Sequence, residues 1–266
     1  MSADGLAKNI KNEGMEKILR PDVKHVIAVM SGKGGVGKSS ITALLAAGAR
    51  KEGFKTGILD ADITGPSIPC MFGLKTSPES KKLTPAESSL GIKIISLNLF
   101  LVNEDDPVIW RGPLIGGAVK QFWKDVDWGK LDYLFIDLPP GTADAPLTVM
   151  QSIPLDGVVV VSSPQDLAGR IVKKALKMAK SMSIPVLGLV ENMSYFTCPH
   201  CGDKINIFGP PKGEKVARET GIPFLASLPL DEDLSHCCDN GTVETFSSNL
   251  FKQLLDSQKL KMKKSV

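Results

Sequence analysis

The glycine-rich run at residues 32–39, GKGGVGKS, constrains the fold of this chain more than any other stretch. It follows a short apolar run, HVIAVM at residues 25–30, and leads into a helix-like stretch at residues 38–53. The run fits the pattern G-x-x-x-x-G-K-[ST], in which glycines let backbone N–H groups curl around phosphate oxygens. The N-terminus of the following helix adds partial positive charge. The sequence therefore predicts a strand, a phosphate-binding loop and a helix in immediate succession.

Apolar runs and helix-like stretches alternate along most of the chain. Continuous apolar strands are typical of parallel sheets covered on both faces, and their alternation with helices indicates a doubly wound α/β architecture. Strands are expected at residues 25–30, 56–60, 92–98, 133–137, 157–163, 185–192 and 223–228. Helices are expected at 38–53, 116–126, 166–182, 213–220 and 243–258, with a polar loop at 75–91. We predict a single-domain P-loop NTPase fold with a mainly parallel sheet and ligands at the carboxyl ends of its strands.

The residues of the glycine-rich loop have separate expected roles. Lys38 is placed to reach the β- and γ-phosphates of a nucleotide, and the Ser39 hydroxyl is placed to bind Mg²⁺. The nucleotide contacts are expected from Gly32, Lys33, Gly34, Gly35, Val36, Gly37, Lys38, Ser39 and Ser40. A glycine-rich turn that fits the pattern by chance is the alternative, and the flanking strand and helix argue against it.

Acidic residues at two strand ends are expected to complete this site. Asp137 ends the apolar strand YLFID, and its carboxylate is expected to hold the Mg²⁺ shell while the Gly141 N–H senses the γ-phosphate. Asp60 and Asp62 follow the second strand. We expect Asp62, which lies farther into the loop, to orient or deprotonate the attacking water, whereas Asp60 either shares that work or braces the strand end.

The expected nucleotide is ATP. The guanine-reading pattern N-K-x-D is absent from the sequence, which favours adenine. Asn192 ends a later strand, where its amide can hydrogen-bond the base edge. The stretch LPLDED at residues 228–233 is expected to close the other side of the base pocket through Pro229, Leu230 and Asp231.

A second lysine, Lys33, lies inside the loop, outside the position that Lys38 fills. An additional cation can stabilise the charge that develops during phosphoryl transfer. The run SGKGGVGKSS resembles the deviant Walker A motif of the family that includes MinD, ParA, the arsenite-pump ATPase and the nitrogenase iron protein. This resemblance implies that Lys33 crosses the interface of a homodimer to the partner's nucleotide, and we assign catalytic roles to Lys33, Lys38 and Asp62. A solvated lysine on an exposed loop is the alternative for Lys33.

Two cysteines, Cys198 and Cys201, follow directly after an apolar strand. A C-x-x-C turn directs two thiolates to one point and supplies half of a four-sulfur metal site. Cys70 stands alone, and the adjacent Cys237 and Cys238 are poorly spaced for binding one ion. Two chains related by a twofold axis contribute four sulfurs, so the cysteine pair and the second lysine both indicate a dimer.

Further motifs resemble the Mrp-type iron–sulfur cluster carrier ATPases, a group that includes bacterial ApbC and the cytosolic scaffold proteins of eukaryotes. The likeness covers roughly residues 20–245 in collinear order and rests on DADITGPSIP, RGPL, DYLFIDLPPGTAD, VVSSPQ, ENMSYFTCPHCG and IFG. It implies that Cys198 and Cys201 of each subunit bridge a labile 4Fe–4S cluster. It also implies that ATP binding or hydrolysis is coupled to transfer of this cluster to apo-proteins.

The chain departs from that group in two places. Its N-terminal arm holds no cysteine, so the additional ferredoxin-like cluster of some eukaryotic members is not expected. His236, Cys237 and Cys238 stand where relatives often have no cysteines. Metal binding by these three residues is one interpretation, and local sequence drift is the other.

Other functions remain open at this point. Structural zinc needs the same thiolates and can occupy an emptied iron–sulfur site, and a dithiol redox pair is a further alternative. A spatial regulator of the MinD/ParA kind is favoured by the C-terminal stretch, where Leu250, Phe251, Leu254 and Leu255 share one helical face and lysines follow. A packed helix with a solvated basic tail explains the same pattern, and a regulator has no need of the cysteine pair. A nucleotide-switched scaffold that only holds client proteins is the last alternative.

Composition limits the partners and the compartment. The net charge of +3 is too small to indicate a nucleic-acid partner without a clustered basic patch. No apolar run approaches the roughly 20 residues that span a bilayer, and the N-terminus lacks the apolar centre of a secretion signal. We therefore expect a cytoplasmic protein without stable membrane association, whose five cysteines are free, metal-bound or redox-active. We expect an N-terminal arm at 1–22, the ATPase domain at 23–250, and a helix end and basic tail at 251–266.

Overall fold

The computed structural model describes residues 20, 22–62, 65, 67–75, 84–96, 99, 112–165 and 168–257, with the backbone alone at 112–115 and 168–171. Residues 1–19 and 21 of the expected N-terminal arm and the lysines of the basic tail lie outside these residues. Among the described helices, none is long and apolar enough to cross a membrane.

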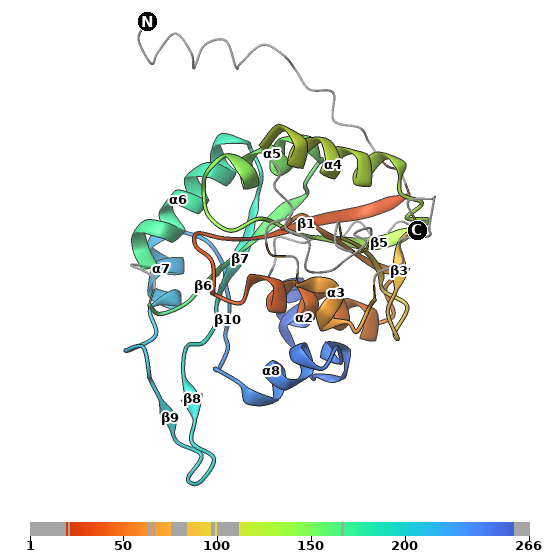
Figure 1. Ribbon diagram of the computed structural model, residues 1–266. Coiled ribbons are helices and arrows are strands. Elements are labelled where there is room, and N and C mark those ends of the chain that lie inside the picture. The colour runs from red at the N-terminus through yellow and green to blue at the C-terminus, as the bar shows by residue number, and fades with distance from the viewer. Residues whose placement is uncertain are drawn as a thin grey trace, which may run out of the picture.

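A twisted sheet of eight strands forms the centre of the described structure, in the order β10-β7-β6-β1-β5-β2-β4-β3 (Figure 1). Every neighbouring pair is parallel except β3 and β4. The strands are β1 (Val23–Ser31), β2 (Thr56–Asp60), β3 (Ala86–Glu87), β4 (Lys93–Ser96), β5 (Leu131–Asp137), β6 (Gly157–Ser162), β7 (Val186–Glu191) and β10 (Phe224–Ser227). The predicted α/β architecture is confirmed.

Helices cover both faces of this sheet (Figure 1). Successive residues of β1 alternate between two hydrophobic cores: Ala28 and Met30 face one, and Ile27 and Val29 face the other. The first core is closed by α4 (Gly112–Asp125), α5 (Asp144–Ser152), α6 (Ala168–Ser181) and α7 (Gly213–Thr220). The second is closed by α2 (Lys38–Lys51), α3 (Ile68–Met71), the 3₁₀ turn η2 (Val243–Thr245) and α9 (Leu250–Asp256), with α8 (Glu232–Asp239) beside α3. Burial on both faces explains why the strands read as continuous apolar runs.

The predicted helix over residues 243–258 is wrong in its first half. The chain there forms η2, leaves the helical path, and begins α9 only at Leu250. Glu244 turns inward, where its carboxylate accepts the Ser88 hydroxyl at 2.5 Å and the Leu90 N–H at 3.2 Å. The Ser248 hydroxyl then accepts the Leu250 N–H at 3.2 Å, a local bond of the kind that favours a helix start over a helix interior.

Several short elements escape the sequence pattern. Helices α3, α5 and α8 were not expected, and β3 lies at the end of the stretch predicted to be a polar loop. A hairpin of β8 (Phe196–Thr197) and β9 (Lys204–Ile205) is separate from the main sheet and projects from the body of the domain (Figure 1). The strands β3, β8 and β9, of two residues each, and the four-residue α3 are too short to show a hydrophobic period.

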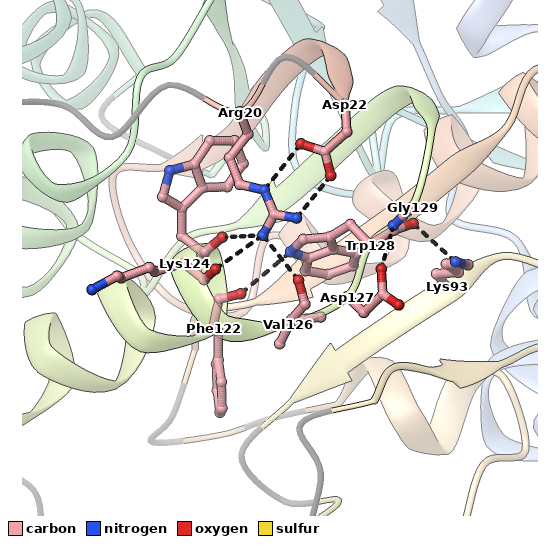
Figure 2. A network of polar contacts seen from close by, with 10 residues as sticks. Arg20, Asp22, Lys93, Phe122, Lys124, Val126, Asp127, Trp128 and Gly129 are labelled. Atoms are coloured by element: carbon pink, nitrogen blue, oxygen red, sulfur yellow. Dashed lines mark hydrogen bonds and ion pairs between the residues drawn. The ribbon is translucent and has the colours of Figure 1, made fainter.

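Arg20 ties the entrance of β1 to the end of α4 (Figure 2). Its guanidinium donates to both carboxylate oxygens of Asp22 at 2.7 and 3.1 Å. It also donates to the carbonyls of Trp123 at 2.8 Å and Val126 at 2.9 Å, where the helix leaves acceptors unsatisfied. The planar fork of arginine suits this set of acceptors, and the guanidinium lowers the pKa of Asp22.

Replacing Arg20 with lysine should lower the free energy of unfolding by about 1–3 kcal/mol, because lysine cannot satisfy several fixed acceptors at once. Arg218→Lys is the matched control, since Arg218 is 79% exposed and its pairing with Glu214 is superficial. Urea titration at pH 7 checks both values. Because ionised Asp22 stabilises the fold only above its lowered pKa, the Arg20 effect should shrink as the pH falls below 3.8. Equal losses of unfolding free energy in Arg20→Lys and Arg218→Lys would contradict this stabilising role of Arg20.

Candidate nucleotide and thiolate sites

The glycine-rich loop lies at the carboxyl end of β1, as predicted. The strand ends at Ser31, and α2 begins at Lys38. Gly37, the residue before the helix, has φ of 79°, a conformation that favours glycine, and any side chain there would meet the Asn192 amide. The strand–loop–helix sequence thus aims the first N–H groups of α2 into the loop, where an anion is favoured.

The ammonium group of Lys38 is buried among carboxylates from two other strand ends. Its Nζ lies 2.8 Å from Oδ2 of Asp137 and 3.4 Å from Oδ2 of Asp62. Lys38 is 6% exposed and Asp137 is 0% exposed, so these charges require each other. Phosphate oxygens offer the same negative charge, so a nucleotide can take over Lys38 from these carboxylates.

Asp60 and Asp62 have different surroundings. Asp60 accepts the Asp62 N–H and the Ser96 hydroxyl, each at 3.1 Å. Burial raises the pKa of Asp60 well above its ordinary value, and the neighbouring Asp137 raises it further. Asp60 therefore braces the strand end, one of its two expected roles, while Asp62 contacts Lys38.

The oxygen atoms around Ser39 fit a magnesium ion. The Ser39 hydroxyl donates to Oδ2 of Asp137 at 2.6 Å, which joins a hydroxyl and a carboxylate next to the phosphate loop. Mg²⁺ prefers oxygen ligands and is usually held by one or two carboxylates together with substrate phosphates. The chemistry of Ser39 and Asp137 therefore fits Mg²⁺, and their role as magnesium contacts stays a prediction.

A cavity of about 260 Å³ opens beside the loop, and all four predicted base-binding residues line it, together with Ser40 of the predicted phosphate contacts. Ser40, Asn192, Pro229, Leu230 and Asp231 all line it. Sequence reasoning missed the other lining residues: Met71, Met193, Leu234, Ser235, Cys238 and Asp239. Four of these come from α8, whose start is signalled by Asp231 as N-cap, with its carboxylate accepting the Leu234 N–H at 3.0 Å. A larger hollow of about 660 Å³ lies at the amino ends of β1 and β5 and holds none of the predicted site residues.

Three predicted nucleotide contacts have other bonds in this structure. The Asn192 amide nitrogen donates to the Val36 carbonyl at 3.0 Å, so Asn192 holds the phosphate loop from outside. The Gly141 N–H donates to the Ser31 carbonyl at 3.0 Å. The Lys33 carbonyl accepts the Ser31 hydroxyl at 2.9 Å. Their roles toward the base, the γ-phosphate and a partner subunit stay predictions.

Cys198 and Cys201 lie in the turn of the β8–β9 hairpin, which sequence reasoning had not identified. The Cys198 N–H donates to the Asp203 carbonyl at 2.9 Å, and the Gly202 N–H returns to the Cys198 carbonyl at 2.9 Å. Backbone N–H groups of Cys201 and His200 lower the pKa of the Cys198 thiol. A thiolate held in this way is prepared for a metal ion, since metals bind the deprotonated sulfur.

No third ligand completes the cysteine site within the part of the chain that the structure describes. Groups of three or more histidine, cysteine or carboxylate side chains able to hold a metal ion are absent from those residues. Cys237 and Cys238 lie on α8, where Cys238 Sγ approaches the Ser40 hydroxyl at 3.9 Å. Among the described residues, the hairpin thus offers a pair of sulfurs without a third potential metal ligand grouped with them.

The hairpin and the cavity beside the phosphate loop share one wall. The Leu230 N–H donates to the Tyr195 carbonyl at 2.7 Å, and the Ser194 N–H donates to the Leu228 carbonyl at 2.8 Å. Pro229, Leu230 and Asp231 line the cavity beside the loop, and they also line a second cavity of about 240 Å³ next to Phe196, Thr197 and Pro199. We call residues 229–231 the shared strap.

Glu191 joins the two ends of the segment 192–212, which carries Cys198 and Cys201. Its buried carboxylate accepts the N–H groups of Lys212 at 2.9 Å and Gly213 at 2.8 Å, at the start of α7. The Ser194 hydroxyl donates to the same carboxylate at 3.1 Å. One side chain thus holds both ends of the segment from residue 192 to residue 212 by hydrogen bonds.

A parallel sheet, a P-loop with paired Lys38 and Asp137, and an adjoining cavity define a P-loop nucleotide-binding protein. The model of the NUBPL iron-transfer P-loop NTPases, of the ParA group, matches residues 22–261. The chain belongs to this family.

Two relatives at high identity agree with this assignment. An iron-sulfur cluster carrier protein of Clostridium perfringens is 47% identical over 235 residues, which are 85% of this chain and 82% of that protein. A nucleotide-binding protein of Archaeoglobus fulgidus, solved in complex with ADP, is 48% identical with a TM-score of 0.77, covering 87% of this chain and 92% of that one. MinD of Pyrococcus horikoshii, solved with Mg-ADP, shares the fold at 20% identity and a TM-score of 0.62, over 90% of this chain and 100% of that one.

The cysteines should report the two sites through their alkylation rates. Burial raises the pKa of Cys238, whereas N–H donors lower that of Cys198. Because the thiolate is the nucleophile, Cys198 of metal-free protein should react at lower pH than Cys238, whose rate should still rise above pH 9. ADP at ten times its Kd should slow Cys238 about tenfold, since about a tenth of the sites stay open.

Mass spectrometry of the labelled peptides measures each cysteine separately. Exposed Cys70 is the internal control, and its alkylation rate should not change when the nucleotide is added. An unchanged Cys238 rate in protein shown to bind ADP would contradict the placement of the base cavity.

Proposed function

We propose that this protein is an ATP-binding and ATP-hydrolysing carrier of iron–sulfur clusters, which holds a labile 4Fe–4S cluster at a homodimer interface and transfers it to apo-proteins. The hairpin turn with Cys198 and Cys201 carries this proposal, because it presents two cysteine sulfurs in one turn on a domain with a P-loop. The name of the Clostridium perfringens relative supports the cargo, and the ADP of the Archaeoglobus fulgidus structure supports the nucleotide.

A homodimer supplies the ligands that one chain lacks. A four-iron cluster takes four sulfurs, and the hairpin offers two. The hairpin also exposes Ile205 (47%) and the neighbouring Ile207 (51%). Two hairpins related by a twofold axis would bring four sulfurs together and cover these apolar side chains.

The nucleotide site would act through positioning and charge. Lys38 would bind the β- and γ-phosphates, and Ser39 and Asp137 would hold a Mg²⁺ ion, which would supply positive charge beside the phosphates. Asp62 orients the water that attacks the γ-phosphorus, and the bond to the β-γ bridging oxygen breaks. Lys33 of the partner subunit stabilises the charge that develops on the transferred group.

The shared strap supports coupling between nucleotide and cargo. The same three residues border the base cavity and the space under the hairpin. A base that enters one cavity therefore contacts the wall of the other. A backbone bond from Leu230 of the strap to Tyr195, and one between the preceding Leu228 and Ser194, join this wall to the strand that leads to Cys198.

Anaerobic reconstitution should give a brown protein with about two irons per chain, corresponding to one four-iron cluster per dimer. Replacing Cys198 or Cys201 with alanine should abolish the cluster, because each removes a ligand. Cys70→Ala is the control and should retain it. Iron analysis, visible spectra and sedimentation measure cluster and dimer together.

The same measurement separates the alternatives. A full cluster in the Cys198→Ala/Cys201→Ala double variant would refute the proposal. Zinc in the anaerobic protein, with no iron bound on reconstitution, would favour a structural zinc site.

Lys33→Ala should leave ADP affinity within about twofold and lower ATP turnover about 10³-fold, the scale of a cation supplied in trans. Lys24→Ala is the control, because Lys24 pairs with Asp132 at the amino ends of β1 and β5, the strand ends opposite the phosphate loop. Mixing Lys33→Ala with Lys38→Ala protein should restore part of the turnover, since a mixed dimer holds one complete site. Unchanged turnover in Lys33→Ala, or no recovery on mixing, would contradict the role in trans.

A further inference from the structure

Among the described side-chain contacts of Asp137, the one with Thr42 stays in place under the proposed catalytic roles. Three side chains of α2 reach this carboxylate. Lys38 and Ser39 contact Oδ2 at 2.8 and 2.6 Å, and the Thr42 hydroxyl donates to Oδ1 at 2.8 Å. Under the proposed function, Lys38 turns to phosphate and Ser39 to the metal ion. Thr42 has no such second task.

The position of Thr42 follows from the helix that the phosphate loop begins. Thr42 lies four residues after Lys38, so both side chains project from the same face of α2 toward the end of β5. Thr42 is 0% exposed. Its branched Cβ restricts the side chain to few rotamers, so packing fixes the direction of the hydroxyl.

The single hydroxyl hydrogen of Thr42 has two acceptors. The Lys38 carbonyl lies 3.1 Å away and Oδ1 of Asp137 lies 2.8 Å away. A carboxylate is the stronger acceptor, and the shorter distance agrees with it. The Thr42 hydroxyl therefore donates its hydrogen bond to Asp137. It can donate to the Lys38 carbonyl when the carboxylate is removed.

We propose that Thr42 is a positioning residue for the metal site: its hydroxyl holds Oδ1 of Asp137 so that Oδ2 faces Ser39 and the incoming magnesium ion. This inference rests on the proposed function, because it assigns Asp137 to the metal shell. Partners that orient a ligating carboxylate typically change metal affinity by about 10- to 100-fold when removed.

The test compares ADP affinity with Mg²⁺ and with EDTA in the full chain by calorimetry. Thr42→Val keeps the shape of the side chain and removes the donor. In this variant the Mg²⁺-dependent gain in ADP affinity should fall about tenfold, while ADP affinity in EDTA stays within about twofold. Thr42→Ser restores the donor and should restore the gain.

Thr56→Val is the matched control. Thr56 is 1% exposed, and its hydroxyl donates to the Phe54 carbonyl at 3.2 Å, away from any carboxylate. Both valine variants lose one buried hydroxyl, so a general loss of stability should affect them alike. Only Thr42→Val should change the response to Mg²⁺. If Thr42→Val does not fold, Thr42→Ala provides the same comparison on a residue favoured in helices.

Each outcome decides the proposal. An unchanged Mg²⁺ gain in Thr42→Val or Thr42→Ala would overturn it and leave the proposed function intact. An equal fall in Thr56→Val would reduce Thr42 to a structural residue. Wild-type protein that binds ADP without any gain from Mg²⁺ would overturn both the positioning role and the proposed magnesium site.

Discussion

The buried pair of Lys38 and Asp137 is the interaction on which the site depends. Neither charge can remain in the interior without the other, and the fold places them together because β5 lies next to β1 in the sheet. The phosphate loop is consequently held in shape before a nucleotide arrives. Binding of a phosphate group by Lys38 would then exchange one anionic partner of this lysine for another.

The sequence predicted the parts of this protein that repeat a strong pattern. Long apolar strands and the glycine-rich loop identified the sheet, the helix α2 and the end of β5 with its Asp137. Sequence reasoning also grouped Asn192 with residues 229–231, because carboxyl ends of parallel strands meet at one side of the sheet, and these residues line one cavity. Their contacts with a base stay a prediction. It missed Thr42, although its spacing of four residues from Lys38 was a usable signal.

Other features depend on contacts between distant residues. The break before α9 follows from Glu244 turning toward Ser88, which lies 156 residues away in the chain. The β8–β9 hairpin has strands of two residues, too short for a pattern of alternation. The part of Asn192 in supporting the phosphate loop is equally invisible in the sequence, since its partner is a backbone carbonyl.

The hydrogen bonds of Glu191 bear on how an iron–sulfur cluster could leave the protein under the proposed function. Small metal-binding modules commonly lose their structure when the metal is removed, because the metal is the main bond that holds them. Here backbone hydrogen bonds shape the cysteine turn, and the Glu191 carboxylate holds the two ends of the segment that carries it. These bonds do not involve the cysteine sulfurs. Under the proposed function, a cluster could therefore leave or enter the turn without breaking the hydrogen bonds that shape it.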